Sequence, residues 1–355
     1  MLAQYFDTLA AQHIPYKGGA WCYEDGLIYF GLEALHRASG DPRWLAHIER
    51  LIAPQVGTGV GLAGYHMSDY NIDNIFSGRA LLYLHEVSGD EKWLERAGLL
   101  AKQLQTQPRT KSGVYWHKLR YPWQIWLDGL YMGLPFQIAY AQRVGAPGLI
   151  DDALQQLRTA LEITYIPETR LYAHAFDEAR VQQWASPKTG VNSAHWARAV
   201  GWLAMALVDI AELVGHQKFN PFRQDTSRLL NQIAELRQPS GLWLQVIDQP
   251  RLAGNWEETS ASAMFAYALL KGQLLGLWDG PGAEIREKVI KRSVASDEGN
   301  TLRMVDICHV AGLGTFEGRY RDGTAEYYIS EDIITDDPKG VGPLMRLYAL
   351  APSIV

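Results

Sequence analysis

Apolar residues recur at helical spacing along most of the chain. Between Trp196 and Val214 they step by four, three, four, three and four positions, so that they share one face of a helix. Counting an N-terminal helix at Leu2–Gln12, six segments are apolar nearly all round and six more carry one polar face. The polar-faced segments include Glu91–Thr106, Leu149–Thr164, Arg223–Leu236 and Glu284–Ala295.

An internal repeat supports this division into helices. The segment FGLEALHRASGDPRWL matches RALLYLHEVSGDEKWL, which lies 49 positions later, in a shared frame of Leu-His, Ser-Gly-Asp and Trp-Leu. Each copy predicts a helix that ends at a glycine (Gly40 or Gly89) and a second helix capped by the next aspartate (Asp41 or Asp90). Weaker copies predict helix ends at Gly145, Gly215 and Gly272.

The alternation of the two helix types predicts an all-α fold, an (α/α)6 barrel with apolar inner helices and amphipathic outer ones. No linker rich in Pro, Gly or Ser divides the chain, so we expect a single domain over residues 1–355. All inner helices of such a ring begin at the same end. The loops before them, which have room for short strands, should therefore converge on one mouth, where helix N-termini favour a carboxylate ligand.

Composition narrows the class of protein. The chain has 47% hydrophobic and 20% charged residues, which is typical of a soluble globular protein, and its net charge of −6 without a basic run gives no sign of nucleic-acid binding. No apolar stretch of eighteen residues and no signal-peptide pattern appear, so we expect no membrane span and a cytoplasmic location. Two cysteines without a CxxC spacing do not suggest a disulfide framework or a zinc site. A monomer and a homodimer are equally compatible with the sequence.

The segment WLDGLYMGLPF contains the sharpest candidate for chemistry, Asp128. An aspartate at the start of an apolar helix is also an excellent cap, and local sequence alone does not separate the two roles. Trp126 and Met132 flank the carboxyl group with apolar surface, which favours the protonated form of a carboxyl group and suits a proton donor. Pro135 falls inside the expected helix and predicts a kink or a late start.

A second carboxylate precedes the second inner helix. The segment SDYNIDNIFSGRALL holds Asp69 and Asp73, and Asp73 opens this helix as Asp128 opens the third. Both could be simple caps. Glycoside chemistry usually requires two carboxyl groups across one mouth, and Asp73 is the stronger candidate for the second.

Further polar and aromatic residues lie in the same loops. His117 and His174 are isolated among aromatic residues, without the spacing of a metal site, so we expect no metal and no other cofactor. Trp196, Arg198 and Trp202 fall in the first two turns of an inner helix, where Arg198 could clamp a carboxylate or bind a structural acid. GxSxG, P-loop and GxGxxG motifs are absent.

Taken together, the motifs resemble glycoside hydrolase family 105, the unsaturated rhamnogalacturonyl hydrolases. The resemblance rests on WCYEDGLIYFGLEALHRASGD, DYNIDNI, WHK, WLDGLYMGLPF, LYAHAFDE, HWARAVGW, ETSASAMFAYALLKG, YRDGTAEYYISE and DDPKGVGPLM, in order from Trp21 to Met345. It implies an (α/α)6 barrel that hydrates the C4–C5 double bond of a terminal 4,5-unsaturated galacturonyl residue linked to rhamnose. The products would be a keto-uronic acid and a shortened oligosaccharide.

The resemblance also implies roles for individual residues. Asp128 matches the general acid/base and Asp73 the second catalytic carboxylate. The remaining matches would surround the substrate, namely Trp196, Arg198, His117, His174, Trp126, Met132, Trp202 and Tyr23. One departure concerns the fourth inner helix, where the family pattern Arg-Gly-Asn-Gly-Trp is replaced by Arg-Ala-Val-Gly-Trp. The missing amide affects the expected substrate preference more than the reaction type.

Three alternatives remain at this level. The related family 88, the unsaturated glucuronyl hydrolases, shares the architecture and chemistry and acts on other lyase products. An (α/α)6 sugar epimerase could use His117 and His174 as its acid and base, although the ordered aspartate motifs argue against it. A helical-repeat interaction module would carry near-identical units, whereas only the first two repeats match well here.

Overall fold

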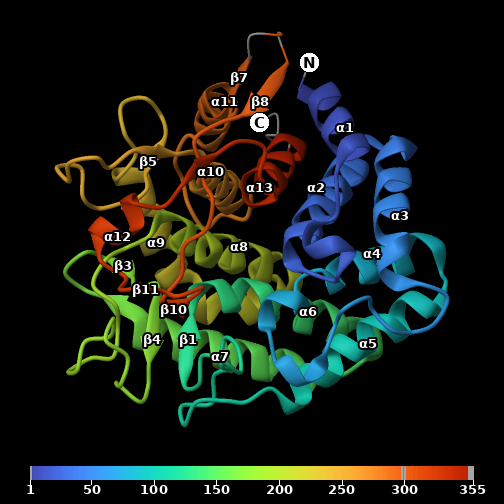
Figure 1. Ribbon diagram of the computed structural model, residues 1–355, viewed down its shortest axis with the longest axis horizontal. Helices are drawn as coiled ribbons and strands as arrows, with labels where there is room; N and C mark the ends of the chain where they lie inside the picture. Colours follow the sequence, from blue (N-terminus) through green and yellow to red (C-terminus); the bar gives the residue numbers. More distant parts are fainter. Residues whose placement is uncertain (1, 297–298, 300, 351–355) are drawn as a thin grey trace.

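The computed structural model describes residues 2–296, 299 and 301–350, and these form a closed double ring of helices (Figure 1). Each inner helix contacts the next inner helix along the chain, and the last contacts the first. The inner ring consists of α2 (Tyr23–Ser39), α4 (Gly78–Ser88), α6 (Leu127–Val144), α8 (Ala197–Phe219), α10 (Thr259–Leu274) and α13 (Pro338–Ala349). The predicted (α/α)6 barrel is therefore confirmed.

Within the described residues, six outer helices surround the ring; α1 precedes the first inner helix, and each of the other five returns the chain from one inner helix to the next. They are α1 (Leu2–Gln12), α3 (Pro42–Val56), α5 (Glu91–Thr106), α7 (Pro147–Thr164), α9 (Arg223–Glu235) and α11 (Gly282–Ser293). Trp44 of α3 is 2% exposed and packs the outer helix against the core. A short helix, α12 (Ala325–Ile329), lies in the last long connection.

Short antiparallel strand pairs occupy the loops. Within the described residues they are β1 (Gln124–Trp126) with β4 (Ala175–Asp177), β2 (Tyr165–Ile166) with β3 (Leu171–Tyr172), β5 (Trp243–Leu244) with β6 (Glu257–Glu258), β7 (Val294–Ser296) with β8 (Leu302–Met304), β9 (Ile307–Cys308) with β12 (Ile333–Ile334), and β10 (Gly314–Phe316) with β11 (Arg319–Arg321). Single 3-10 turns lie at η1 (Tyr16–Gly19), η2 (Met67–Asp69), η3 (Ile72–Ile75) and η4 (Asn220–Phe222). The strand pairs stabilise the loops that precede the inner helices.

The predicted helix ends are mostly confirmed. The predicted glycines Gly40, Gly89 and Gly145 adopt the left-handed conformation directly after a helix. The predicted caps Asp41 and Asp90 each accept a hydrogen bond from the backbone N–H two positions later. The expected helix end at Gly272 was wrong, because α10 continues to Leu274. Of the two effects expected from Pro135, the late start is absent, because α6 begins at Leu127 and includes Pro135. Gly215 does break the regular helix, with φ of 75°, but α8 resumes to Phe219.

One buried acid joins the inner helices at the centre of the ring. Asp209 of α8 is 1% exposed. Three cations surround its carboxylate, at 2.7 Å from Arg346 of α13, 2.9 Å from Lys271 of α10 and 3.3 Å from Arg79 of α4. Tyr131 of α6 accepts a bond from Arg346, and Phe30 of α2 lies beneath the guanidinium groups of Arg79 and Arg346. Burial would raise the pKa of Asp209, but the surrounding cations hold it well below its usual range.

Candidate active site

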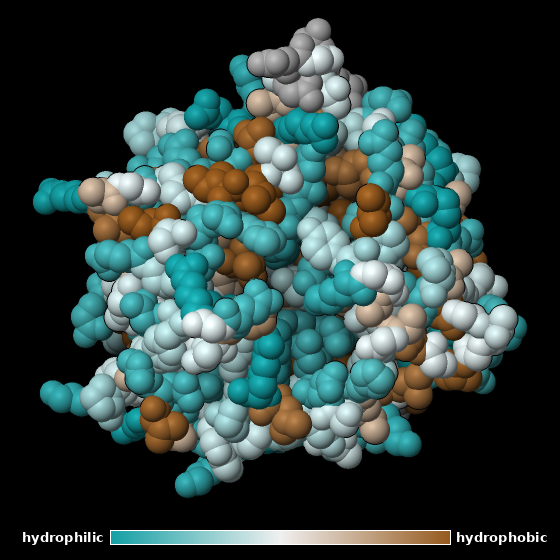
Figure 2. Space-filling model, viewed as in Figure 1, coloured by the Kyte–Doolittle hydropathy of each residue, from teal (hydrophilic) through white to brown (hydrophobic). Residues whose placement is uncertain are grey.

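A cavity of about 730 Å³ opens at the end of the ring where the inner helices begin. Four segments line it, drawn from residues 17–24, 64–74, 117–128 and 310–321. The first three precede or open α2, α4 and α6, and the fourth precedes α13, so four of the six loops meet at one mouth as predicted. The loops before α8 and α10 contribute no residue to the lining. The face of the molecule in Figure 2 is hollowed near its middle, where hydrophilic residues border the opening.

Asp128 lies in the first turn of α6 and does not cap it. The capping position belongs to Trp126, which makes no side-chain capping bond, so the simple capping role considered for Asp128 is wrong. Its carboxyl Oδ2 is buried, has no hydrogen-bond partner among the described residues, and lies 3.2 Å from Nε2 of His174. Pairing of β1 with β4 sets this approach, because Leu127 N–H donates to the His174 carbonyl at 2.9 Å. The carboxyl group thus lies at the cavity in contact with His174, and its buried oxygen is not used by a hydrogen bond within the described residues.

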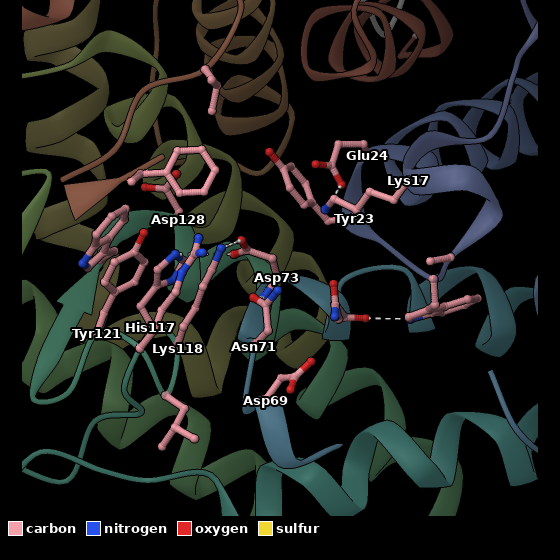
Figure 3. A pocket seen from close by; sticks show the side chains of 18 of the residues that line it. Lys17, Tyr23, Glu24, Asp69, Asn71, Asp73, His117, Lys118, Tyr121 and Asp128 are labelled. Atoms are coloured by element: carbon pink, nitrogen blue, oxygen red, sulfur yellow. Dashed lines mark hydrogen bonds and ion pairs between the residues drawn. The ribbon is translucent and has the colours of Figure 1, made fainter. Parts of the chain in front are cut away.

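Asp73 lies in η3, one turn before α4, and pairs with a cation. Lys118 Nζ is 2.5 Å from its Oδ2, and His117 Nε2 is 3.7 Å from its Oδ1 (Figure 3). Burial would raise the pKa of Asp73, but the Lys118 ammonium and then His117 outweigh burial and keep it below the usual range. Asp73 therefore stays ionised at neutral pH, and it is not a cap, since Ser77 occupies the capping position of α4.

Aromatic rings form one wall of the cavity. The ring of Trp126 stacks on His117 with centroids 4.5 Å apart and on Tyr121 with centroids 4.8 Å apart. Both stacks are nearly parallel, at 14° and 19°. Tyr23, from the start of α2, lines the cavity as well, and the Lys17 ammonium lies 5.7 Å from the centre of its ring (Figure 3). A flat apolar wall beside carboxylates is suited to a sugar ring.

Four other expected substrate-binding residues are buried away from the cavity lining. His174 Nδ1 is 2.7 Å from the Tyr328 hydroxyl, and Trp196 stacks on Tyr328 with centroids 6.0 Å apart. Met132 and Trp202 are 1% and 2% exposed within the barrel. These four residues do not line the cavity, although His174 touches Asp128.

Arg198 is also buried, and its guanidinium is engaged with the protein. It donates to the Cys308 carbonyl at 2.5 Å, the His309 carbonyl at 3.2 Å and Ser260 Oγ at 3.1 Å. Ser260 in turn donates to Glu258, the cap of α10. In this conformation Arg198 fixes the chain that leads into the cavity-lining residues 310–311 and does not line the cavity itself.

The comparisons with known proteins agree with this geometry. The model of Glycosyl Hydrolase Family 88 matches residues 5–351. The chain belongs to this family. It is also similar to a family 105 glycoside hydrolase structure from C. acetobutylicum ATCC 824, with 33% identity, a TM-score of 0.92 and 98% of each chain covered. The chain is thus a glycoside hydrolase of the family 88 and 105 group, which acts on unsaturated uronyl saccharides.

Two proteins are similar to this chain in sequence. Protein Atu3128 of Agrobacterium fabrum is 49% identical over 61% of this chain and 97% of its own length. The unsaturated rhamnogalacturonyl hydrolase YesR of Bacillus subtilis is 26% identical over 71% of this chain and 70% of its own length. Among the described residues of this glycoside hydrolase, no helix is long and apolar enough to cross a membrane, and no cluster of three or more His, Cys, Asp or Glu side chains could hold a metal ion.

Several residues of the family 88 site were missed in the sequence. Lys118 is the partner of Asp73, and it stands beside His117 in the WHK motif, so its position was a usable signal. Lys17, Tyr121 and Arg321 also line the cavity. No local sequence pattern identifies these three as site residues; the bond between Arg321 and Tyr121, for example, joins positions 200 residues apart.

The buried His117 of this glycoside hydrolase makes its stability depend on pH. Burial, opposed by the charge of Asp73 and aided by Lys118, lowers the pKa of His117 from 6.5 to about 4. Between these values the unfolded chain binds the extra proton and the folded chain does not. The free energy of unfolding should therefore fall as pH falls from about 6.5 to about 4, by at most about 1.4 kcal/mol per pH unit from this group.

The variant His117→Gln, which cannot titrate, should show a shallower loss of stability over the same range. Thermal unfolding of both proteins between pH 7 and pH 4 measures the difference. Equal slopes for the two proteins would show that His117 does not carry this dependence.

Proposed function

We propose that the protein hydrates the C4–C5 double bond of a terminal 4,5-unsaturated galacturonyl residue linked to rhamnose. The observation that carries the proposal is the carboxyl group of Asp128, which does not cap its helix and lines the same cavity as the ion-paired Asp73. The two groups differ in environment, as a proton donor and a charge-stabilising carboxylate must. Similarity to YesR, which is named an unsaturated rhamnogalacturonyl hydrolase, supports rhamnose as the neighbouring sugar.

In the first step, Asp128 donates its proton to C4 of the vinyl ether, and positive charge develops at C5 and the ring oxygen. Asp73, kept ionised by Lys118, stabilises this charge. Trp126 and His117 provide the flat wall against which the unsaturated ring lies. General acid catalysis of this kind needs one proton donor at hydrogen-bond distance from the substrate.

In the second step, water adds to C5 and its proton passes to the Asp128 carboxylate, which restores the starting state. The new hydroxyl at C5 makes the ring a hemiketal. Opening of the hemiketal breaks the bond between C5 and the ring oxygen, which gives a ketone at C5 and leaves a hemiacetal at C1. Collapse of this hemiacetal to an aldehyde breaks the bond to the leaving sugar, whose oxygen takes up the hydroxyl proton, and frees the keto-uronic acid and the shortened sugar. Atoms balance with one water consumed for each bond between sugars that is cleaved.

The test is an ultraviolet assay with the unsaturated rhamnogalacturonan disaccharide, because the conjugated double bond absorbs and its hydration removes the signal. We expect absorbance to fall with the wild-type protein and a keto-uronic acid to accumulate. A signal that falls only with unsaturated glucuronyl disaccharides would replace rhamnogalacturonan by another polysaccharide. No loss with either substrate class would refute the hydration mechanism.

A further inference from the structure

The positive charges around the cavity differ in whether a carboxylate neutralises them. Lys17 is paired with Glu24 at 3.0 Å and Lys118 with Asp73 at 2.5 Å. Two arginines also line the cavity, Arg120 and Arg321. Neither makes an ion pair with any acidic residue in the part of the chain that the structure describes, in contrast to the two lysines.

The guanidinium of Arg321 is unusual because it is buried without a carboxylate partner among the described residues. Its side chain comes from β11 and is only 7% exposed. It donates to the Tyr121 hydroxyl at 3.0 Å, the Leu313 carbonyl at 3.1 Å and the Gly314 carbonyl at 3.3 Å, all of them neutral acceptors. Because a buried charge is costly without a partner of opposite sign, a negative group of a ligand would stabilise it.

Arg120 lies on the exposed rim beside it. Its guanidinium carbon is 4.9 Å from the centre of the Tyr121 ring and 5.1 Å from that of Phe316, while the Arg321 guanidinium is 4.9 Å from the same Phe316 ring. The two arginines thus share Phe316 of the β10–β11 hairpin and Tyr121 of the wall. Cation–π contacts hold a guanidinium in place and leave its N–H groups available to an anion.

The arginines lie beyond the reacting groups along the aromatic wall. His117 approaches Asp73, Trp126 stacks on His117, and Tyr121 stacks on Trp126. The arginines contact the Tyr121 end of this wall. A saccharide whose unsaturated ring lies between Asp73 and Asp128, and whose next residues follow this wall, brings those residues to the arginines.

We propose that Arg120 and Arg321 form an anion subsite that binds a carboxylate on the leaving part of the oligosaccharide. The inference rests on the proposed function and adds to it a preference for acidic over neutral leaving groups. The preferred substrate is then longer than a disaccharide and contains a second uronic acid. Guanidinium groups suit this task because their planar fork matches a carboxylate.

The experiment compares two substrates that share the same unsaturated end. The unsaturated disaccharide leaves a neutral rhamnose, whereas the tetrasaccharide leaves a saccharide that contains a uronate. We expect kcat/KM of the wild type to be roughly tenfold higher for the tetrasaccharide, and Arg120→Ala to bring the ratio close to one through KM. Arg120→Lys should restore part of the ratio, since it keeps the charge and loses the fork.

Arg251→Ala is the matched control, because it removes an exposed arginine that does not line the cavity. It should leave both values of kcat/KM and their ratio unchanged. If Arg120→Ala lowers kcat/KM equally for both substrates, or leaves their ratio as in the wild type, the subsite is refuted.

Equilibrium binding separates failure of the subsite from failure of the proposed function. The dissociation constant of the tetrasaccharide is measured by calorimetry with Asp128→Asn and with Asp128→Asn/Arg120→Ala. About tenfold weaker binding by the double variant supports the anion subsite even if the wild type hydrates neither substrate. Equal affinities overturn it, whatever the wild type does in the absorbance assay.

Discussion

Asp128→Asn should abolish most hydration while leaving the fold intact. The amide cannot donate the carboxyl proton to C4, and general acid–base catalysis is worth about 10²–10⁴-fold, so we expect kcat to fall by about that factor. Stability should change little, because the side chain does not cap α6 and its buried Oδ2 accepts no hydrogen bond from the described residues. Initial rates with the unsaturated disaccharide, together with thermal unfolding, measure both effects.

Asp69, a further carboxylate that lines the cavity, provides the control for this variant. Asp69→Asn removes the same charge from an exposed position that also lines the cavity. We expect it to keep kcat within about tenfold of the wild type, because the loss of one negative charge from the cavity leaves the proton donor, Asp128, in place. If both variants lose activity equally, or if Asp128→Asn retains wild-type rates, Asp128 is not the proton donor.

Asp209→Ala should be among the most destabilising single substitutions in the chain. Removal of this carboxylate leaves Arg346, Lys271 and Arg79 close together without the acid that they share. Breaking a buried ion pair by removing one partner costs about 3–5 kcal/mol, because the remaining charge is buried and unpaired. Denaturant titration of the wild type and the variant measures the free energy of unfolding.

An exposed ion pair gives the comparison for Asp209. Asp151 pairs with Lys218 at 3.1 Å on the surface, where both side chains are well exposed. Asp151→Ala should change the free energy of unfolding by less than about 1 kcal/mol. A similarly small change for Asp209→Ala would mean that the central network does not hold the inner ring together.

The sequence predicted those features of the fold that depend on local patterns. The Gly40–Asp41 and Gly89–Asp90 junctions follow directly from the chemistry of helix ends, and they were placed correctly. Gly272 was misplaced because a glycine in a fully buried helix can be kept for close packing rather than for a turn. A Cβ there would come within 2.6 Å of the Leu230 side chain.

The site was predictable only in part, because several of its contacts join distant segments. Local sequence could not distinguish a capping role for Asp128 from a catalytic one, since both place an aspartate at the start of an apolar helix. The bonds from Arg198 to the carbonyls of Cys308 and His309 span more than a hundred positions, so a carboxylate clamp appeared plausible from its aromatic neighbours alone. The pairing of Asp73 with Lys118 likewise depends on how two loops meet.

Closure of the ring between its first and last helices has a consequence for synthesis of the protein. Gly342 of α13 approaches α2 so closely that a Cβ would lie 2.6 Å from the Leu27 carbonyl oxygen, and Tyr5 donates to Asp336 across 331 positions. At ribosomal rates of about 5–20 residues per second, the early helices wait roughly 15–65 s for these partners. During that interval the nascent chain presents apolar helix faces that nothing yet covers, which makes it a natural client for chaperones that bind emerging polypeptides.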